Sequence, residues 1–386
     1  MKRSIGIVGI IFFLLIINPA QIWAVTQEKE ETVEAFMQED ILEELEFESL
    51  DNFMKELGKD ITFYELLEQI LADGWNVDAI EQLTKWLWGQ LFSELHANKK
   101  LFLEVLLITF CFSLLKNSVG TFGSAYMSDS CFLLVYSVLA VLLLKSVYLF
   151  QYIVAETLEQ CVTFMKIFVP CFCTGMFFSS NTYSSSGFYQ LAFLVIYLVE
   201  GAFKIFLLPC IHMYILLQVF NHFFEEGQFG NFAELLETIV NWGLRIALTA
   251  VLGLSAVQNL INPVKDRMAQ GAIGRTAAAI PAVGNVVGSV GELILGTGMM
   301  IKNGIGVAGI VVLVLIGRGP LIKTCLLAFS YKIMAAVTEP LSDRRISSCI
   351  MVLSKGTLLY TRLLGEGMVL FLVMIALAVS ATSFVY

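Results

Sequence analysis

The residues of this sequence that could do chemistry are charged side chains set within apolar stretches. Ten lie inside or close to such stretches: Glu104, Lys116, Lys145, Lys166, Glu200, Lys204, Arg245, Glu292, Lys302 and Arg318. A charge at the centre of a bilayer costs at least about 2.5–3.5 kcal/mol. Long Lys and Arg side chains can reach the headgroups, which explains most of the basic residues without a function. The shorter Glu104, Glu200 and Glu292 are better candidates for a polar pathway or a pore lining.

The common catalytic motifs are absent from the sequence. Its eight cysteines form no C-x-x-C pair, and its three histidines show no metal-ligand spacing. The sequence contains no G-x-x-x-x-G-K-[ST], no H-E-x-x-H and no G-x-S-x-G. We therefore expect no enzyme, no catalytic residue, no metal and no cofactor. Any ATP-driven step would need a partner.

A glycine-rich block at 271–309 supplies most of the other candidate residues. The candidates for helix packing or pore lining are Pro281, Gly284, Gly288, Gly291, Glu292, Lys302, Gly304 and Gly306, with Pro340 and Asp343 further along the chain. Gly284 and Gly288 are four residues apart, a spacing that lets membrane helices approach closely. We expect a hairpin that turns near Lys302 and packs against itself or against other copies. Ordinary helix packing explains any single glycine equally well.

The composition places these residues in a membrane protein. Apolar residues make up 57% of the 386 positions and charged residues 15%, and the mean hydropathy is +0.77. A soluble domain has about 45–50% apolar and about 25% charged residues. The net charge of −9 would repel a nucleic acid backbone. These values exclude a soluble enzyme and a nucleic-acid binder, and they predict an all-α polytopic fold.

The predicted organisation has three parts. Residues 1–24 form a signal peptide, with Lys2 and Arg3 before an apolar run and a cleavage site after Ala24; an uncleaved anchor is the alternative. Residues 25–100 form an acidic, helical, extracytoplasmic segment. Thr62 with Glu65, and Asp78 with Glu81, fit the capping-box spacing in this segment. Its apolar stripe could meet a partner, pack on itself or lie on the bilayer surface.

Residues 101–386 form a polytopic domain with about six to eight predicted spans. The clearest apolar stretches are 101–115, 130–150, 161–178, 188–220, 238–257, 303–317 and 367–386. Basic residues in 258–275 and 317–345 predict that both segments are cytoplasmic, and the acidic loop after residue 220 predicts an external position.

The block from Ile280 to Asp343 resembles a known family. The matching segments are Ile280–Gly284, Lys302–Gly306, Pro320–Lys323, Tyr331–Lys332 and Glu339–Asp343. Their order and spacing are similar to the stage III sporulation protein AE family over roughly 240–386. Glu339 and the Arg344–Arg345 pair depart from the family pattern, and no catalytic residue can be carried over.

The resemblance implies a place in the mother-cell membrane around the forespore. It implies a subunit of a transport or secretion complex, a feeding-tube channel between the two cells. The implied partners are the lipid bilayer, a cytoplasmic ATPase, small membrane subunits, ring-forming subunits and a forespore membrane protein. Close glycine packing adds the expectation of a homo-oligomer.

Two other functions remain open from the sequence. A stand-alone secondary transporter of a small solute would often show an inverted repeat with paired broken helices. The interrupted block 271–320 has no evident twin in 101–257, which counts against a transporter. The other alternative is a structural scaffold that anchors a ring.

Overall fold

The protein is helical throughout the part of the chain that its structure, a computed structural model, describes. The described residues are 47–58, 62–73, 99–100, 103–114, 125–178, 182–223, 229–277, 284–340 and 344–381. The helices are α3 (Glu48–Glu56), α4 (Phe63–Asp73), a short helix at Leu103–Leu114, α6 (Ala125–Phe178), α7 (Thr182–Leu198), the π-helix η1 (Val199–Leu207), α8 (Leu208–Phe223), α9 (Gly230–Ala277), α10 (Gly284–Thr338) and α11 (Arg344–Ala381). The signal peptide and its Ala24 cleavage site lie outside the described residues.

Five helices of the described chain are long and apolar enough to cross a membrane. They confirm the predicted all-helical, polytopic class. The separately predicted stretches 130–150 and 161–178 belong to one continuous helix, α6, of 54 residues. At 1.5 Å per residue this helix is about 80 Å long, far more than the roughly 30 Å of bilayer hydrocarbon.

The expected hairpin in the glycine-rich block is wrong. Helix α10 runs without a break from Gly284 to Thr338, so Lys302 lies inside a helix and not at a turn. Asn and Gly favour turns in water, where a broken backbone bonds to solvent. In apolar surroundings a helix keeps each backbone N–H and C=O bonded, and this requirement overrides the local turn signal.

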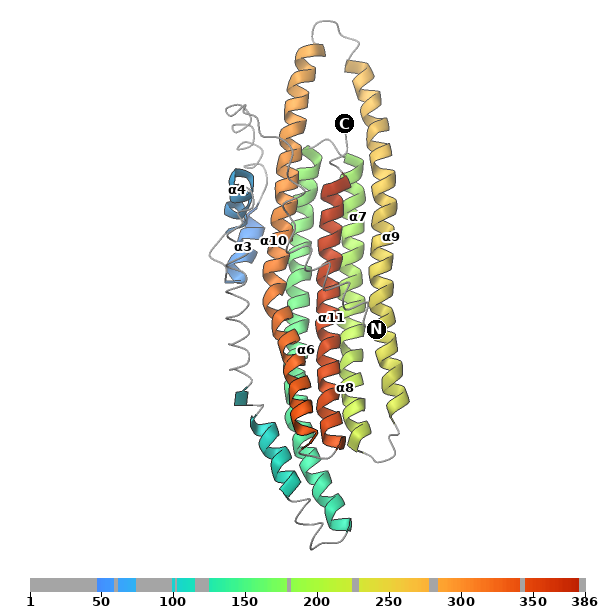
Figure 1. The fold of residues 1–386 in the computed structure, drawn as a ribbon. Helices are drawn as coiled ribbons and strands as arrows, with labels where there is room; N and C mark the ends of the chain where they lie inside the picture. The colour runs from blue at the N-terminus through green and yellow to red at the C-terminus, as the bar shows by residue number, and fades with distance from the viewer. Residues whose placement is uncertain are drawn as a thin grey trace.

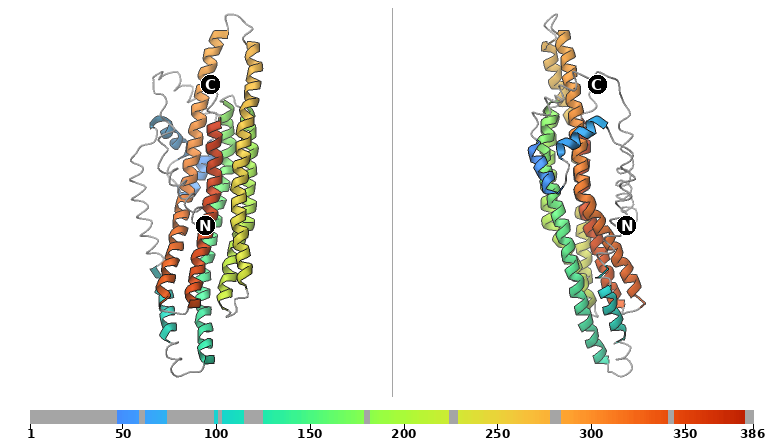
Figure 2. Two further views of the ribbon diagram at one scale, coloured as in Figure 1. Left: turned by 45° about the vertical axis from the view of Figure 1, so that its right-hand side comes forward. Right: turned by 90° about the vertical axis from the view of Figure 1, so that its left-hand side faces the viewer.

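The five long elements form an elongated up-and-down bundle (Figure 1). Helices α6, α9 and α11 run one way, whereas α7–η1–α8 and α10 run the other (Figures 1 and 2). Helix α11 lies at the centre, where it packs against α6, α8, α9 and α10. Beyond the end of α11, α9 and α10 continue as two extended arms (Figure 1).

Polar side chains bond the buried faces of the bundle together. On α11, the Ser354 hydroxyl donates to the Ala328 carbonyl of α10 at 2.8 Å, and Ser347 donates to Ala335 at 3.0 Å. The Tyr331 hydroxyl of α10 donates to Ser146 Oγ of α6 at 2.6 Å. Lipid provides no hydrophobic drive for helix association, so hydrogen bonds and close packing hold such helices together.

Helices α3 and α4 pack onto the outside of the bundle, against α6 and α10 (Figure 2). Phe53 of α3 meets Phe164 with ring centroids 5.9 Å apart, and Phe63 of α4 meets Phe168 at 6.4 Å. The Thr62–Glu65 capping box is confirmed, with reciprocal bonds of 3.0 and 3.2 Å. This part of the acidic segment therefore packs against the membrane domain. The Asp78–Glu81 pair lies outside the described residues.

The chain direction bears on the predicted orientation. The turn after α10 and the start of α9 lie at one end of the bundle, and the end of α9 lies at the other (Figure 1). The basic segments 258–275 and 317–345 are thus separated by one passage of α10 through the bundle. If α10 crosses the membrane once, these two segments cannot both be cytoplasmic, as the positive charges alone predicted.

Candidate functional site

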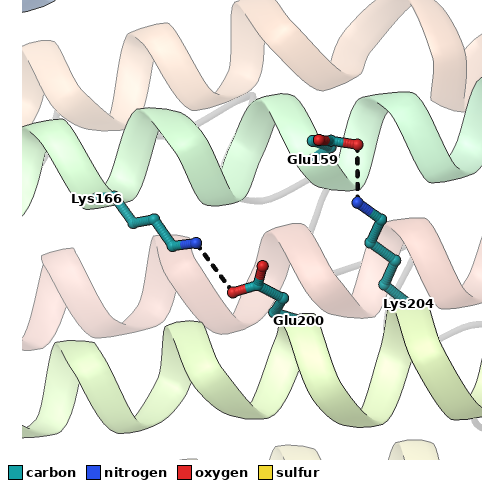
Figure 3. Close-up of polar contacts among 4 residues, drawn as sticks. All are labelled: Glu159, Lys166, Glu200 and Lys204. Atoms are coloured by element: carbon teal, nitrogen blue, oxygen red, sulfur yellow. Dashed lines mark hydrogen bonds and ion pairs between the residues drawn. The ribbon is translucent and has the colours of Figure 1, made fainter.

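Four charged side chains form two ion pairs between α6 and η1 (Figure 3). Glu159 accepts a hydrogen bond from Lys204 at 2.7 Å, and Lys166 donates one to Glu200 at 3.0 Å. We call these four residues the charged quartet. Along α6, Glu159 comes before Lys166. On η1, Lys204 lies opposite Glu159 and Glu200 lies opposite Lys166, so a negative side chain meets a positive one at each of the two levels. The four charges therefore alternate in a checkerboard (Figure 3).

The charged quartet lies on the outer surface of the bundle. The exposed fractions of its side chains are 64% for Glu159, 48% for Lys166, 41% for Glu200 and 34% for Lys204. Each of the four nonetheless belongs to a helix that is apolar enough to span a membrane. Exposed charges of this kind fit contact with water or protein, and they do not fit contact with lipid tails.

The backbone on the η1 side of the charged quartet is a π-helix. Glu200 and Lys204 both belong to the nine-residue segment η1. A π-helix bonds each N–H to the carbonyl five residues earlier, and such segments often occur at functional sites. Gly201 lies between the two, and no atom is within 4 Å of the position that a Cβ would take there. The surface beside the pairs is therefore open.

One exposed line of residues runs along α6 and changes character partway. Its members are spaced three or four apart, so they share one side of the helix. The lower members are mainly apolar, namely Leu134, Val138, Val141, Lys145, Tyr148 and Tyr152. The upper members are Glu156, Glu159, Thr163, Lys166, Pro170 and Thr174. All but Pro170 are polar, and we call these five polar residues the polar stripe. The lower part alone spans about 27 Å, close to the thickness of bilayer hydrocarbon.

Apolar side chains are also exposed on the upper bundle, next to the charged quartet in the sequence. Tyr197, Ile205 and Phe206 are exposed by 79%, 71% and 54% on α7 and η1. Exposed apolar side chains continue on α9 with Leu252 and Val257. At the level of the charged quartet the molecule therefore exposes polar and apolar side chains together. Neither water alone nor lipid alone suits both surfaces.

A second charged group lies inside the bundle at the same level. Arg362 of α11 donates to Glu366 Oε1 and to Asn241 Oδ1 of α9, both at 2.7 Å. The Glu366 side chain is 4% exposed, and its Oε2 atom has no hydrogen-bond partner in the described part of the protein. Next to it, a Cβ on Gly367 would lie 3.0 Å from Leu158 Cδ2, the neighbour of Glu159. This contact places the inner pair at the level of Glu159 in the bundle.

The structure distributes the predicted candidate residues along α10 and does not gather them at one point. Lys302, Gly304 and Gly306 are buried, and a Cβ on Gly306 would overlap Val379 of α11. Pro340 is exposed in the turn after α10. The helix includes Gly284, Gly288, Gly291 and Glu292, but their surroundings are outside what the structure describes, as are Pro281 and Asp343. Their functional roles stay predictions.

The sequence reasoning missed several residues of the two charged groups. The sequence does not single out Glu159, because this residue falls between two apolar stretches that are predicted as separate spans. The sequence does indicate the pair Arg362 and Glu366, because opposite charges four residues apart can pair on one face of a helix. The pairing of Lys166 with Glu200 joins residues 34 positions apart. No local pattern marks such a pair.

Comparisons with known proteins agree with the resemblance of the glycine-rich block. A family model described as stage III sporulation protein AE matches residues 61–382. The Stage III sporulation protein AE of Bacillus subtilis (strain 168) is 25% identical over 279 residues, which cover 72% of this chain and 70% of that protein. No solved structure matches.

Proposed function

The chain belongs to the stage III sporulation protein AE family, and from this premise we propose that it is a membrane subunit of a transport or secretion channel. The channel would link the mother cell to the forespore, and the protein would lie in the mother-cell membrane that surrounds the forespore. Residues 25–100 would face the space between the two cells. A cytoplasmic ATPase would supply energy, and ring-forming subunits would extend the passage.

The observation that carries this proposal is the mixed surface of the upper bundle. The polar stripe is unsuited to lipid, whereas Tyr197, Ile205 and Phe206 at the same level are unsuited to water. Partner proteins would satisfy this surface if they offered polar groups to the polar stripe and apolar side chains to the exposed apolar residues. In a protein that works alone in a bilayer, part of such a surface would contact an unsuitable solvent. A subunit of a larger membrane assembly needs a surface of this kind.

The experiment compares two tryptophan variants on the same side of α6. Thr163→Trp places a bulky ring within the polar stripe, and Val141→Trp places the same ring among the lower, lipid-suited residues. Both positions are exposed, so neither change disturbs the core. We expect Thr163→Trp to remove the proteins that contact the polar stripe, further copies of this chain among them, from a mild-detergent purification of sporulating cells. Val141→Trp should retain them.

Two results would contradict the proposal. One is a wild-type protein that purifies without any other sporulation subunit and binds a small solute, which is the behaviour of a stand-alone transporter. The other is equal recovery of partners with both variants, which would show that the polar stripe is not a contact surface.

A further inference from the structure

We propose that the charged quartet is a self-recognition surface, on which a second copy of this chain docks about a two-fold axis parallel to the bundle. The inference deepens the proposed function, because it names the protein that covers this part of the upper bundle. Its basis is the order of the four charges on α6 and η1, together with the apolar residues that flank them.

The checkerboard is complementary to itself in one particular geometry. At one level Glu159 of α6 lies beside Lys204 of η1, and at the next level Lys166 lies beside Glu200 (Figure 3). A two-fold axis along the bundle sets α6 of one copy against η1 of the other. Each Glu then faces a Lys of the other copy at both levels, and like charges do not meet.

This axis is also the one that a membrane permits. Copies inserted by the same route have the same orientation, so a two-fold axis that relates them must lie along the membrane normal. A two-fold interface uses the same surface patch on both subunits, as the checkerboard requires. An axis across the helices would instead invert one copy relative to the bilayer.

The flanking residues favour a second copy over water. Ile205 and Phe206 are exposed beside Lys204 in the same π-helix. A water-filled passage would leave this apolar surface wet, and lipid would leave the ion pairs without polar contacts. A second copy supplies charged side chains to the charged quartet and apolar side chains to the apolar residues around it. This arrangement is typical of protein interfaces, in which apolar and paired polar groups are mixed.

Docking would enlarge each ion pair without breaking it. Each carboxylate keeps its own Lys and gains the Lys of the other copy, so eight charges form a closed network. A charge pair that is covered by protein is screened less by salt than an exposed pair. The network therefore favours the alignment in which the same ion pairs of the two copies lie at the same height. If one copy were shifted along the axis by one ion pair, like charges would face each other.

The test exchanges the charges within each pair, so that every variant keeps its internal ion pairs. The swapped protein carries Glu159→Lys with Lys204→Glu, and Lys166→Glu with Glu200→Lys. Wild-type and swapped full-length chains are given two different affinity tags and are co-expressed in all combinations. After extraction in mild detergent at low salt, one tag is captured and the amount of the other is measured.

We expect wild type to capture wild type, and swapped to capture swapped, with equal efficiency. Mixed capture should fall at least about tenfold, because like charges then face each other at both levels. A chain swapped at only the Glu159–Lys204 level should give an intermediate mixed yield. Capture within the swapped form is the control for folding.

The inference is overturned if mixed pairs are captured as well as matched pairs, or if the swapped form does not capture itself. The same preparations separate this outcome from a failure of the proposed function. Recovery of other sporulation subunits without self-capture would refute only the inference of a self-recognition surface. Self-capture without recovery of any other subunit would refute only the proposed channel role.

Discussion

Glycine residues of α10 differ in what an added methyl group would meet. At Gly309 a Cβ would overlap the ring of Phe168, which is held in a stack between Phe164 and Phe172 with centroids 5.3 and 5.6 Å away. At Gly319 no atom lies within 4 Å of the Cβ position. Gly309 is therefore a contact point between helices, and Gly319 is free to change.

We predict opposite effects of the same substitution at these two positions. Gly309→Ala should destabilise the protein by about 1–3 kcal/mol, because an overpacked core must shift side chains and backbone. Gly319→Ala should be neutral or stabilising by up to about 1 kcal/mol, because Ala is the better helix former. Thermal unfolding of the purified proteins in detergent measures both. Equal melting temperatures would refute the packing role of Gly309.

The inner ion pair permits a second prediction at the residue scale. Arg362→Leu leaves the Glu366 carboxylate buried without its cation, which should cost about 3–5 kcal/mol. The double variant Arg362→Leu with Glu366→Met removes both charges, and it should recover most of this loss, since apolar replacement of a buried pair is often neutral. Thermal unfolding again gives the measurement. A double variant as unstable as the single one would show that pairing is not what matters here.

At the element scale, α4 depends on a residue of α3 for its first turn. Asp51 Oδ1 accepts hydrogen bonds from the backbone N–H groups of Phe63 at 2.7 Å and Tyr64 at 3.4 Å. These N–H groups have no partner within the helix. The bonds tie the two short helices together where both contact the bundle.

We predict that Asp51→Ala loosens α4. The lost cap should cost about 1 kcal/mol, and backbone amides of Phe63–Asp73 should exchange with deuterium several-fold faster. Asp51→Asn keeps an oxygen acceptor and should exchange as the wild type does. If the Asn variant exchanged as fast as the Ala variant, the effect would come from charge and not from capping.

The elements also show what the sequence can and cannot predict. The Thr62–Glu65 capping box and the apolar class of the long helices depend on local pattern, and the structure confirms both. The continuity of α6 could not be predicted, because Glu156 and Glu159 lower the hydropathy between two apolar stretches. Tertiary contacts with η1 supply the partner that keeps Glu159 within the helix. The charged quartet itself joins two distant segments, so only the fold reveals it.

At the scale of the whole molecule, the alternating helices predict which ends share a compartment. The start of α9 and the end of α10 lie at one end of the bundle, and the end of α9 lies at the other (Figure 1). Phe229 precedes α9, Glu339 follows α10, and Ala277 is the last residue of α9. Reporter fusions at Phe229 and Glu339 should therefore agree with each other. A fusion at Ala277 should give the opposite result. Identical results at all three positions would rule out a single crossing by each of α9 and α10.

The balance of signs in the charged quartet governs its response to an electric field. A charge that moves across the full membrane potential exchanges about 2.3 kcal/mol per 100 mV. The charged quartet contains two positive and two negative groups that are paired at each level. If this surface slid or tilted as one body, the work done on its cations would cancel the work done on its anions. In the proposed channel, two cells at different membrane potentials could thus be joined through this surface without the voltage pulling it open or closed.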